Sequence, residues 1–532
     1  MRNKYFLLVL GLYLLSWKAI GQERYIDQIF DNVTIQKDVT YGANYTALFL
    51  PVLGSTALIP LQMDVYQPEG DTASERPLVI MLHTGNFLPI QVNGGVTGSK
   101  ADSAVVEVCN RLAKMGYVVA SADYRTGWDP FAASVSLRTL GLINAAYRGL
   151  QDSRTCVRFF KRDKAEGGDN FRIDTSRIVM WGQGTGGYIA LAAATLDEYL
   201  DIVNTEMPPD KFIADINGDG VPDPMIVEMF NGDIDGTTVG VSPGGLVPAG
   251  DTLAIPNHAG YSSKFQLCVN MGGALADIGW LETGQVPIIG FQVPKDQFAP
   301  YGSAILGVPS PQGSLPVVEV QGAFLVAEKS NAVGNNDVFS SVDDETTDAA
   351  IAASEQAGHD YYNGLYPFNR PNVNGFVDGS PWNWWDPSFW DTIPSPSVPG
   401  LSYHEVALLS NPMSPEKGRS YIDTIMAYFA PRAVLALRLA DTTSTSLEGL
   451  DRQDVGLIIS PNPSRGFLQA RSHADQPMQQ IRILDYSGRV LLDRRNLQTS
   501  EYSIDHTRIP TGMYLVEVRF AEGRVVEKVA FE

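Results

Sequence analysis

The chain has 532 residues, a formal net charge of −21 and only three cysteines. This length suffices for one large domain and a smaller one, and the negative charge argues against a nucleic-acid or anionic-membrane partner. Three cysteines are too few for a disulfide scaffold, so we expect Cys109, Cys156 and Cys268 to be core thiols, with at most one disulfide among them.

The N-terminus has the pattern of a secretory signal peptide. Arg2 and Lys4 precede an apolar run from Tyr5 to Trp17, and small residues follow up to Gly21. That run is too short to span a membrane, and no later stretch reaches the roughly 20 apolar residues that a spanning helix needs. We therefore predict a signal peptide at residues 1–21 and no transmembrane segment in the mature chain.

Segments of strand character then alternate with segments of helical periodicity. Alternating or continuous apolar runs of strand character lie at residues 33–65, 77–82, 117–122 and 177–181. Apolar residues with helical spacing lie at residues 105–115 and 142–161. Buried strands that alternate with helices indicate parallel βαβ units, so we predict an α/β body with helices on both faces of the sheet.

Two long segments interrupt this alternation. Residues 206–263 and 331–403 are rich in Asp, Gly and Pro, and we predict that they are insertions in a domain covering residues 22–440. Core strands are predicted at residues 265–269 and 286–291. A helix is predicted at residues 414–430, where the serine and proline that open it are a typical N-terminal cap.

A glycine-rich motif lies between a predicted buried strand and an apolar helix. It reads WGQGTGG (residues 181–187), and it occupies the strand-turn-helix position of a nucleophile elbow, whose pattern is G-x-S-x-G. The chain therefore resembles the carboxylesterase/lipase-like α/β hydrolases over roughly residues 65–438. The resemblance implies a mostly parallel sheet of the α/β-hydrolase type.

The same resemblance assigns residues to an oxyanion hole and a triad acid. His83, Thr84 and Gly85 stand where this family carries its oxyanion loop. Thr185 follows the elbow position, where a backbone N–H completes the oxyanion hole. Asp296, in the segment after the strand at residues 286–291, takes the position of the triad acid.

The chain departs from the family at the nucleophile. The elbow residue is Gly184, which has no side-chain oxygen to attack an ester. Glycine adopts the positive φ of an elbow without strain, so the turn can persist after the nucleophile is lost. His359 and His404 are both candidates for the triad base, and each is equally an ordinary loop histidine when no serine needs activation.

A short acidic loop in the first predicted insertion resembles calcium-binding loops. The sequence DINGDGVPD (residues 215–223) resembles the loops of dockerin and thrombospondin type 3 repeats. The expected ligands are the side chains or backbone carbonyls of Asp215, Asn217, Asp219, Val221 and Asp223, because Ca²⁺ takes six to eight oxygen ligands. The loop has isoleucine at its twelfth position, where an EF-hand has glutamate. We predict a structural Ca²⁺ here, with a metal-free turn as the alternative.

The C-terminal region has a different pattern. After a polar linker at residues 441–454, short strands and tight turns predict a small all-β sandwich over residues 455–532. It contains the motifs SPNPS (460–464), ILDYSGRV (483–490) and PTGMYLVEV (510–518). These resemble the sorting domain of type IX secretion substrates, which implies transit by that machinery and then release or attachment at the cell surface.

These features predict a secreted hydrolase-like protein whose serine mechanism is lost. The first hypothesis is a non-catalytic protein that binds a small ester, peptide or glycan in the old pocket. The second is an active secreted esterase or peptidase-like hydrolase with a different nucleophile or a metal-activated water. The third is a cell-surface adhesion or structural protein.

Overall fold

The computed structural model describes residues 23–439, residue 452 and residues 455–532, except for 311–312, 374, 396–397, 475, 485–489, 508 and 521–522. The predicted signal peptide lies outside the described residues, and so does the predicted linker apart from Arg452. The chain divides into two compact units between Leu439 and Ala440, and each unit has its own hydrophobic core.

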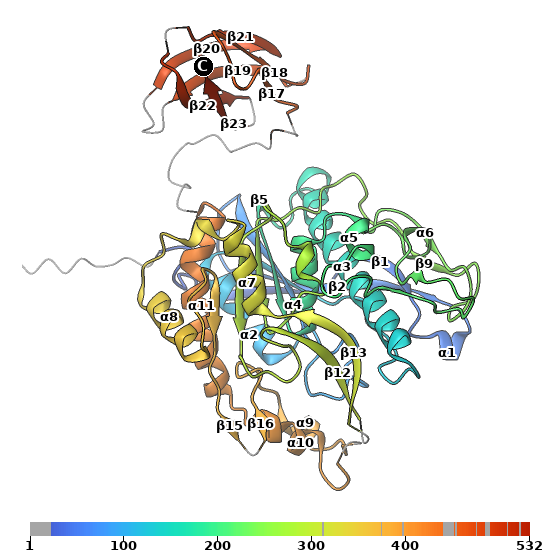
Figure 1. Cartoon of the computed structure of the whole chain (residues 1–532). Coiled ribbons are helices and arrows are strands. Elements are labelled where there is room, and N and C mark those ends of the chain that lie inside the picture. The colour runs from blue at the N-terminus through green and yellow to red at the C-terminus, as the bar shows by residue number, and fades with distance from the viewer. Residues whose placement is uncertain are drawn as a thin grey trace, which may run out of the picture. The chain divides into compact units, whose positions relative to one another are not determined.

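An eight-stranded sheet forms the centre of the first unit (Figure 1). Its strand order is β1-β2-β4-β3-β5-β10-β11-β14. The strands are β1 (Val33–Thr46), β2 (Ala57–Pro68), β3 (Arg76–Leu82), β4 (Val118–Ala122), β5 (Ile173–Gln183), β10 (Leu267–Met271), β11 (Ile288–Gln292) and β14 (Leu365–Pro367). β1 and β2 are antiparallel to their neighbours, and all pairs from β4 to β14 are parallel. The predicted mostly parallel α/β-hydrolase sheet is confirmed.

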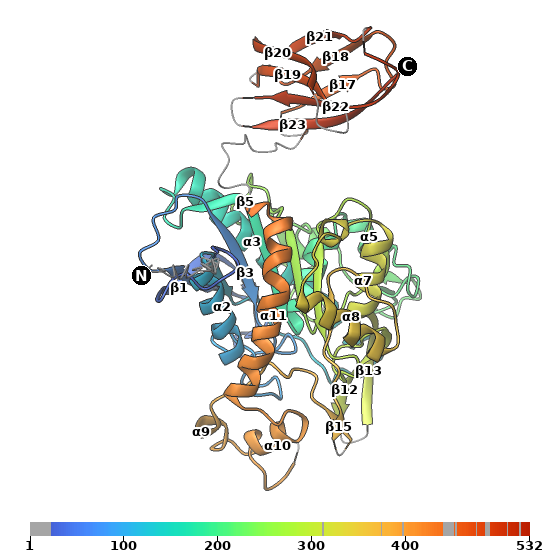
Figure 2. The same ribbon diagram turned by 90° about the vertical axis from the view of Figure 1, so that its left-hand side faces the viewer.

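Helices cover both faces of this sheet. The residues of β3 alternate between two cores, because Leu78 and Ile80 pack in one cluster and Val79 and Met81 in the other. The first cluster contains residues of α3 (Val135–Glu166) and α4 (Thr185–Thr195), and the second contains residues of α2 (Ser103–Met115) and α11 (Pro415–Ala436). Figure 2 shows α2 and α11 beside each other on that second face.

Local sequence explains most of these elements and their ends. All seven residues of β3 are buried, as a continuous apolar strand predicts. α3 is longer than the predicted 142–161 because Ser134 caps it earlier, accepting a hydrogen bond from the Leu137 N–H. α11 begins where predicted, with the Ser414 side chain accepting from the Lys417 N–H. It runs through Pro431 to Ala436, beyond the predicted end.

The two predicted insertions differ in their relation to the sheet. Residues 206–263 contain only short elements: β6 (Ile213–Ala214), β7 (Asp223–Pro224), α6 (Glu228–Asn231), β8 (Gly240–Val241) and β9 (Thr252–Ala254). Residues 331–403 contain η2 (Asp337–Phe339), α8 (Glu345–Ala357), β14, β15 (Asn372–Val373), β16 (Phe376–Val377), α9 (Pro387–Trp390) and the start of α10 (Tyr403–Ser410). Part of the second range therefore belongs to the body, since β14 is the last strand of the sheet and Ala350 of α8 is in the core.

Further elements connect the parts of the body. They are α1 (Leu50–Leu53), α5 (Tyr199–Val203), η1 (Ile278–Trp280), the hairpin of β12 (Ser303–Ser310) and β13 (Gly313–Gln321), and α7 (Ala323–Ala332).

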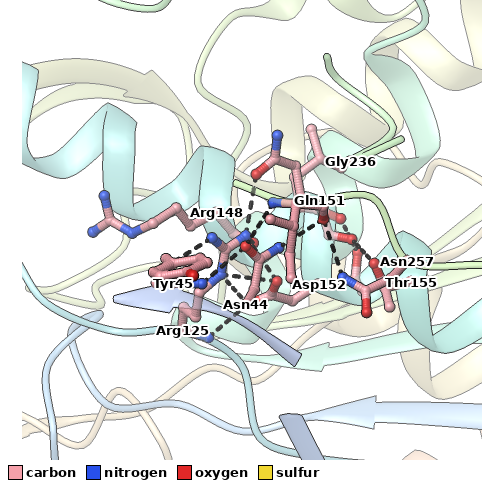
Figure 3. Close-up of polar contacts among 12 residues, drawn as sticks. Asn44, Tyr45, Arg125, Arg148, Gln151, Asp152, Thr155, Gly236 and Asn257 are labelled. Carbon is pink, nitrogen blue, oxygen red and sulfur yellow. Dashed lines mark hydrogen bonds and ion pairs between the residues drawn. The ribbon is translucent and has the colours of Figure 1, made fainter. Parts of the chain in front are cut away.

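A buried polar network on α3 holds the first insertion in place (Figure 3). Arg125 and Asp152 form an ion pair at 2.9 Å with both side chains fully buried, and Arg125 also donates to the Leu253 carbonyl. Gln151 donates to the carbonyls of Asn231 and Asp233 at 2.9 and 2.8 Å. One face of α3 therefore satisfies backbone carbonyls of the insertion that would otherwise be buried without partners.

The second unit is built from antiparallel strands in two sheets. One sheet contains β17 (Ile458–Ser460), β18 (Phe467–Arg471) and β21 (Glu501–Asp505). The other contains β20 (Val490–Thr499), β19 (Met478–Leu484), β22 (Gly512–Arg519) and β23 (Arg524–Phe531). Leu468 of the first sheet and Ile481 and Val516 of the second are in one core, so the predicted C-terminal β domain is confirmed. Most of the motif at residues 483–490 lies outside the described residues.

The three cysteines are free thiols, and all are fully buried. Core thiols were one of the two predicted states, and the structure contains no disulfide between them. Among the described residues, no helix is both long enough and apolar enough to cross a membrane.

Candidate active site

The elbow lies between β5 and α4. Gly184 follows the last residue of β5 and has φ 53° and ψ −119°, a conformation that strains any residue with a side chain. Its N–H donates to the Met271 carbonyl at 2.9 Å, and its carbonyl accepts from the Gly187 N–H at 2.8 Å. The sharp strand-to-helix turn of a nucleophile elbow is therefore present.

Small residues are needed around this turn because backbones approach closely. A Cβ on Gly186 would overlap the Leu82 carbonyl of β3, and a Cβ on Gly187 would lie 3.0 Å from the Gly273 Cα, just beyond β10. The glycines of the WGQGTGG motif thus allow α4 to begin directly against two neighbouring strands.

His83 occupies the exit of β3 and is 3 % exposed. Its Nδ1 lies 2.5 Å from the Thr84 carbonyl, its Nε2 lies 3.3 Å from Asp123 Oδ1, and its ring stacks on Tyr124. Burial disfavours the imidazolium, but the hydrogen bond and charge of Asp123 outweigh it and hold the pKa of His83 above its ordinary value. His83 is therefore held at both ring nitrogens and supports the predicted oxyanion loop.

The predicted oxyanion loop adjoins the start of α4. Tyr124 Oη donates to the His83 carbonyl at 2.8 Å and lies 3.0 Å from Thr185 Oγ1. The first N–H groups of any α-helix have no intrahelical acceptor, and the described residues offer no acceptor to the Thr185 N–H. Such an N–H can stabilise negative charge on a bound carbonyl oxygen.

Asp296 lies in the loop after β11. Its carboxylate accepts from the Phe298 N–H at 2.8 Å, with Gln297 and Ala299 N–H groups as further donors. Part of the residue reaches solvent, while burial of its carboxyl group raises the pKa to about 7. The backbone of Gly379 packs against the carboxylate, because a Cβ there would lie 2.6 Å from Asp296 Oδ1.

Neither of the two predicted triad histidines forms a hydrogen bond with Asp296. His359 Nε2 lies 2.7 Å from Tyr301 Oη, and His404 Nδ1 accepts from Trp385 Nε1 at 3.0 Å. Among the described residues, no hydrogen bond or ion pair joins either histidine to Asp296. The structure thus brings His83, Thr84, Gly184 and Thr185 together, whereas His359 and His404 contact other residues of the described chain and not Asp296.

Four residues around the site were given no role from the sequence. Asn383 Oδ1 accepts from Gln183 Nε2 at 2.5 Å, so the segment after β14 contacts the residue before the elbow. The buried Asp378 pairs with Lys417 next to Gly379. Asp123 and Tyr124 directly follow the buried strand β4, and this position was their one sequence signal.

The predicted calcium loop is a compact acidic turn. Asp215 Oδ1 accepts from the N–H groups of Gly218 and Asp219 at 2.7 and 3.1 Å, and Asp215 Oδ2 accepts from Gly220 at 2.9 Å. Asn217 Nδ2 donates to Asp219 at 3.0 Å. In the described parts of the chain, no three His, Cys, Asp or Glu side chains converge as a metal site. Calcium binding therefore stays a prediction.

Comparisons with known families match both units. Residues 63–216 match the BD-FAE family, a range that includes the predicted oxyanion loop and the elbow but ends before Asp296. Residues 459–532 match the secretion system C-terminal sorting domain. A comparison with curated proteins finds no significant match.

Among solved structures, the chain is similar to esterase 2 of Thermogutta terrifontis. The form phosphorylated by paraoxon is 16% identical, with a TM-score of 0.28, over 58% of this chain and 78% of that chain. The propionate-bound form is 15% identical, with the same TM-score, over 58% and 79%. An immunoglobulin-like β-sandwich protein from Bacteroides vulgatus is 18% identical, with a TM-score of 0.14, over 16% and 95%. Likenesses this distant do not establish function, and the fold follows from the order of the chain's own sheet.

The two family matches agree with the two units of the structure and confirm the resemblances seen in the sequence. The chain has an α/β-hydrolase-type body in which residues 63–216 match the BD-FAE family, and a type IX C-terminal sorting domain that indicates export to the outer membrane, the cell surface or the medium.

Proposed function

We propose that this protein is an exported, non-catalytic relative of esterases that binds an acyl-containing ligand without forming an acyl-enzyme. The observation that carries the proposal is the glycine at the apex of the elbow. Acyl transfer by a hydrolase of this kind begins with a side-chain oxygen or sulfur at that position, and Gly184 has neither.

The surroundings of Asp296 support the proposal. A triad acid holds a histidine in the correct tautomer and orientation, which requires contact between the two groups. Among the described residues, the hydrogen bonds to the Asp296 carboxylate come from backbone N–H groups, and Gly379 lies against that carboxylate. A carboxyl group whose burial raises its pKa to about 7 is poorly suited to stabilise an imidazolium.

The retained elements favour binding over an entirely different role. The N–H at the start of α4 and the oxyanion loop would still accept a carbonyl oxygen, so esters, peptides and acylated glycans are the ligand classes that we propose. The sorting domain implies interaction with the secretion machinery, which supports a binding role outside the cell.

Ester hydrolysis by the mature protein tests the proposal. Short-chain p-nitrophenyl esters should be hydrolysed no faster than by the Asp296→Ala variant, because loss of a triad nucleophile costs about 10⁶ in turnover. The same esters or their non-hydrolysable ketone analogues should still bind, as measured by calorimetry. Turnover that Asp296→Ala abolishes would favour the rival hypothesis of an active hydrolase with another nucleophile.

A further inference from the structure

Thr84 occupies the space beside Gly184 that an elbow side chain needs. A Cβ on residue 184 would lie 2.8 Å from the Thr84 Cβ, and Thr84 Oγ1 would be closer still. Non-bonded carbon atoms pack at about 3.5 to 4.0 Å, so such a Cβ cannot be accommodated without movement. The obstruction is separate from the backbone strain at this position.

Rotation of the Thr84 side chain does not remove this obstruction. The distance of 2.8 Å is to the Thr84 Cβ, whose position does not depend on χ1. Relief would therefore require movement of the oxyanion-loop backbone or replacement of residue 84 by glycine.

The oxyanion-loop backbone is fixed on both sides of Thr84. On one side, the Thr84 carbonyl contacts the buried His83 ring. On the other, Gly85, Asn86 and Phe87 all have positive φ, at 132°, 57° and 53°. The carbonyls of the last two accept hydrogen bonds from Trp128 Nε1 and the Gly127 N–H, at 2.8 and 2.7 Å. Thr84 cannot withdraw without breaking these contacts.

We infer that Thr84 and Gly184 are a matched pair, in which the threonine fills the volume left by the missing elbow side chain. Residue 84, together with residue 184, determines whether a nucleophile fits at the apex. The inference rests on the proposed function, because it explains what fills the space at the apex of an elbow that has no nucleophile. Its consequence is that a serine or cysteine at position 184 does not rebuild a reactive elbow while Thr84 is present.

Thr84 is a space-filling residue rather than a displaced nucleophile. Among the described residues, no hydrogen bond reaches Thr84 Oγ1, so no base is positioned to take its proton. Both nitrogens of the neighbouring His83 already have partners.

Alkylation of an introduced cysteine tests the inference in the mature full-length protein. The native cysteines are fully buried, so a thiol at position 184 is the reactive one. We expect Gly184→Cys with Thr84→Gly to react with iodoacetamide faster than Gly184→Cys alone, on the order of tenfold or more. The thiol can take its place at the helix N-terminus, where it is activated, only when the Thr84 side chain is removed. Intact-mass spectrometry after timed quenching measures the rates.

Thermal stability provides the second measurement, because Gly184→Cys can fail to fold. Thr84→Gly should raise the melting temperature of the Gly184→Cys protein by several degrees, although it lowers that of the wild type, which is the sign of a coupled pair. Thr84→Val is the matched control, because it keeps the branched volume and should neither speed alkylation nor raise the melting temperature. Equal alkylation rates, or an absence of rescue by Thr84→Gly, would overturn the inference. Neither readout depends on ester hydrolysis, so this result and the test of the proposed function can fail separately.

Discussion

At the scale of single residues, the apex of the elbow combines two separate constraints. The backbone at Gly184 has a positive φ that glycine adopts freely, and the adjoining space is taken by Thr84. An active elbow accepts the backbone strain because neighbouring contacts hold the nucleophile in place. Here the Gly184 backbone is held by hydrogen bonds to Met271 and Gly187, while the nucleophile side chain is missing.

Asp296 gives a residue-scale prediction with a defined pH dependence. Burial raises its pKa from an ordinary value near 3.8 to about 7, so between these pH values the folded protein binds more protons than the unfolded chain. The free energy of unfolding therefore falls as pH rises through this window, and the whole decrease is present above pH 7. Asp296→Asn removes the charge but keeps an acceptor for the backbone N–H groups, and it should melt several degrees higher than wild type at about pH 8.

The difference between the two proteins should shrink at about pH 5, where Asp296 is protonated and resembles the amide. Differential scanning calorimetry at both pH values checks this expectation. Asp423→Asn, which removes an exposed carboxylate on α11, is the control and should show no such pH-dependent gap. A gap of equal size at both pH values would contradict the account of Asp296.

At the scale of elements, α3 acts as the support for the first insertion. Arg158 is fully buried, its Nε donates to the Asn257 carbonyl at 3.0 Å, and its Nη2 contacts the Gly236 carbonyl at 3.4 Å. Arg158→Met should leave these carbonyls buried without donors, which costs about 1 to 3 kcal/mol for each group.

Hydrogen exchange should therefore become faster over residues 231–257 in Arg158→Met, with smaller changes in the central strands. Ser136→Ala, at the first turn of the same helix, should leave the exchange pattern unchanged. Uniformly faster exchange throughout the body would show that Arg158 supports the core in general and not the insertion.

The acidic loop at residues 215–223 gives a second prediction at this scale. If the loop binds Ca²⁺, millimolar calcium should raise the melting temperature of the mature protein, because a ligand that binds only the folded state stabilises it. A chelator should reverse the change, and Asp215→Asn should abolish it. An unchanged melting temperature in calcium and in chelator would contradict the prediction that this loop binds Ca²⁺.

The sequence predicted those elements whose own residues have a clear apolar pattern. β3 is apolar over residues 77–82, and Val105, Val108 and Leu112 of α2 repeat with helical spacing, so both were found. β14 was missed because its three residues become a strand only through pairing with β11, which is a tertiary contact. The β12–β13 hairpin was also missed, since few of its residues are buried and no apolar pattern marks it.

The candidate site was predictable to a similar degree. Motifs at the exits of two buried strands indicated residues 83–85 and 184–187, because the exits of parallel strands share one edge of a sheet. The conflict between Thr84 and a side chain at position 184 was not predictable, since it depends on distances between segments about a hundred residues apart. The place of Asp296 beside Gly379 was missed for the same reason.

At the scale of the whole molecule, the chain combines a body and an export signal that have separate cores. Deletion of residues 455–532 should leave a folded body but stop its export, because the sorting domain is the part read by the secretion machinery. Cell fractionation with an antibody to the body measures this, and the shortened protein should accumulate in the periplasm. Asp296→Asn is the control and should be exported normally. Normal export of the shortened protein would show that another part of the chain directs it.

The most direct test of the central claim is whether a covalent adduct forms at the elbow. Mature wild-type protein is incubated with an excess of a fluorophosphonate, and intact-mass and peptide spectra are recorded. The account predicts an unmodified mass, since Gly184 has no side chain to react and no described residue forms a hydrogen bond with Thr84 Oγ1 that could activate it. Attachment of one phosphonyl group to Thr84, Thr185 or any other residue of this site would contradict it. The control is protein that is unfolded before treatment, in which such a site-specific adduct should not form.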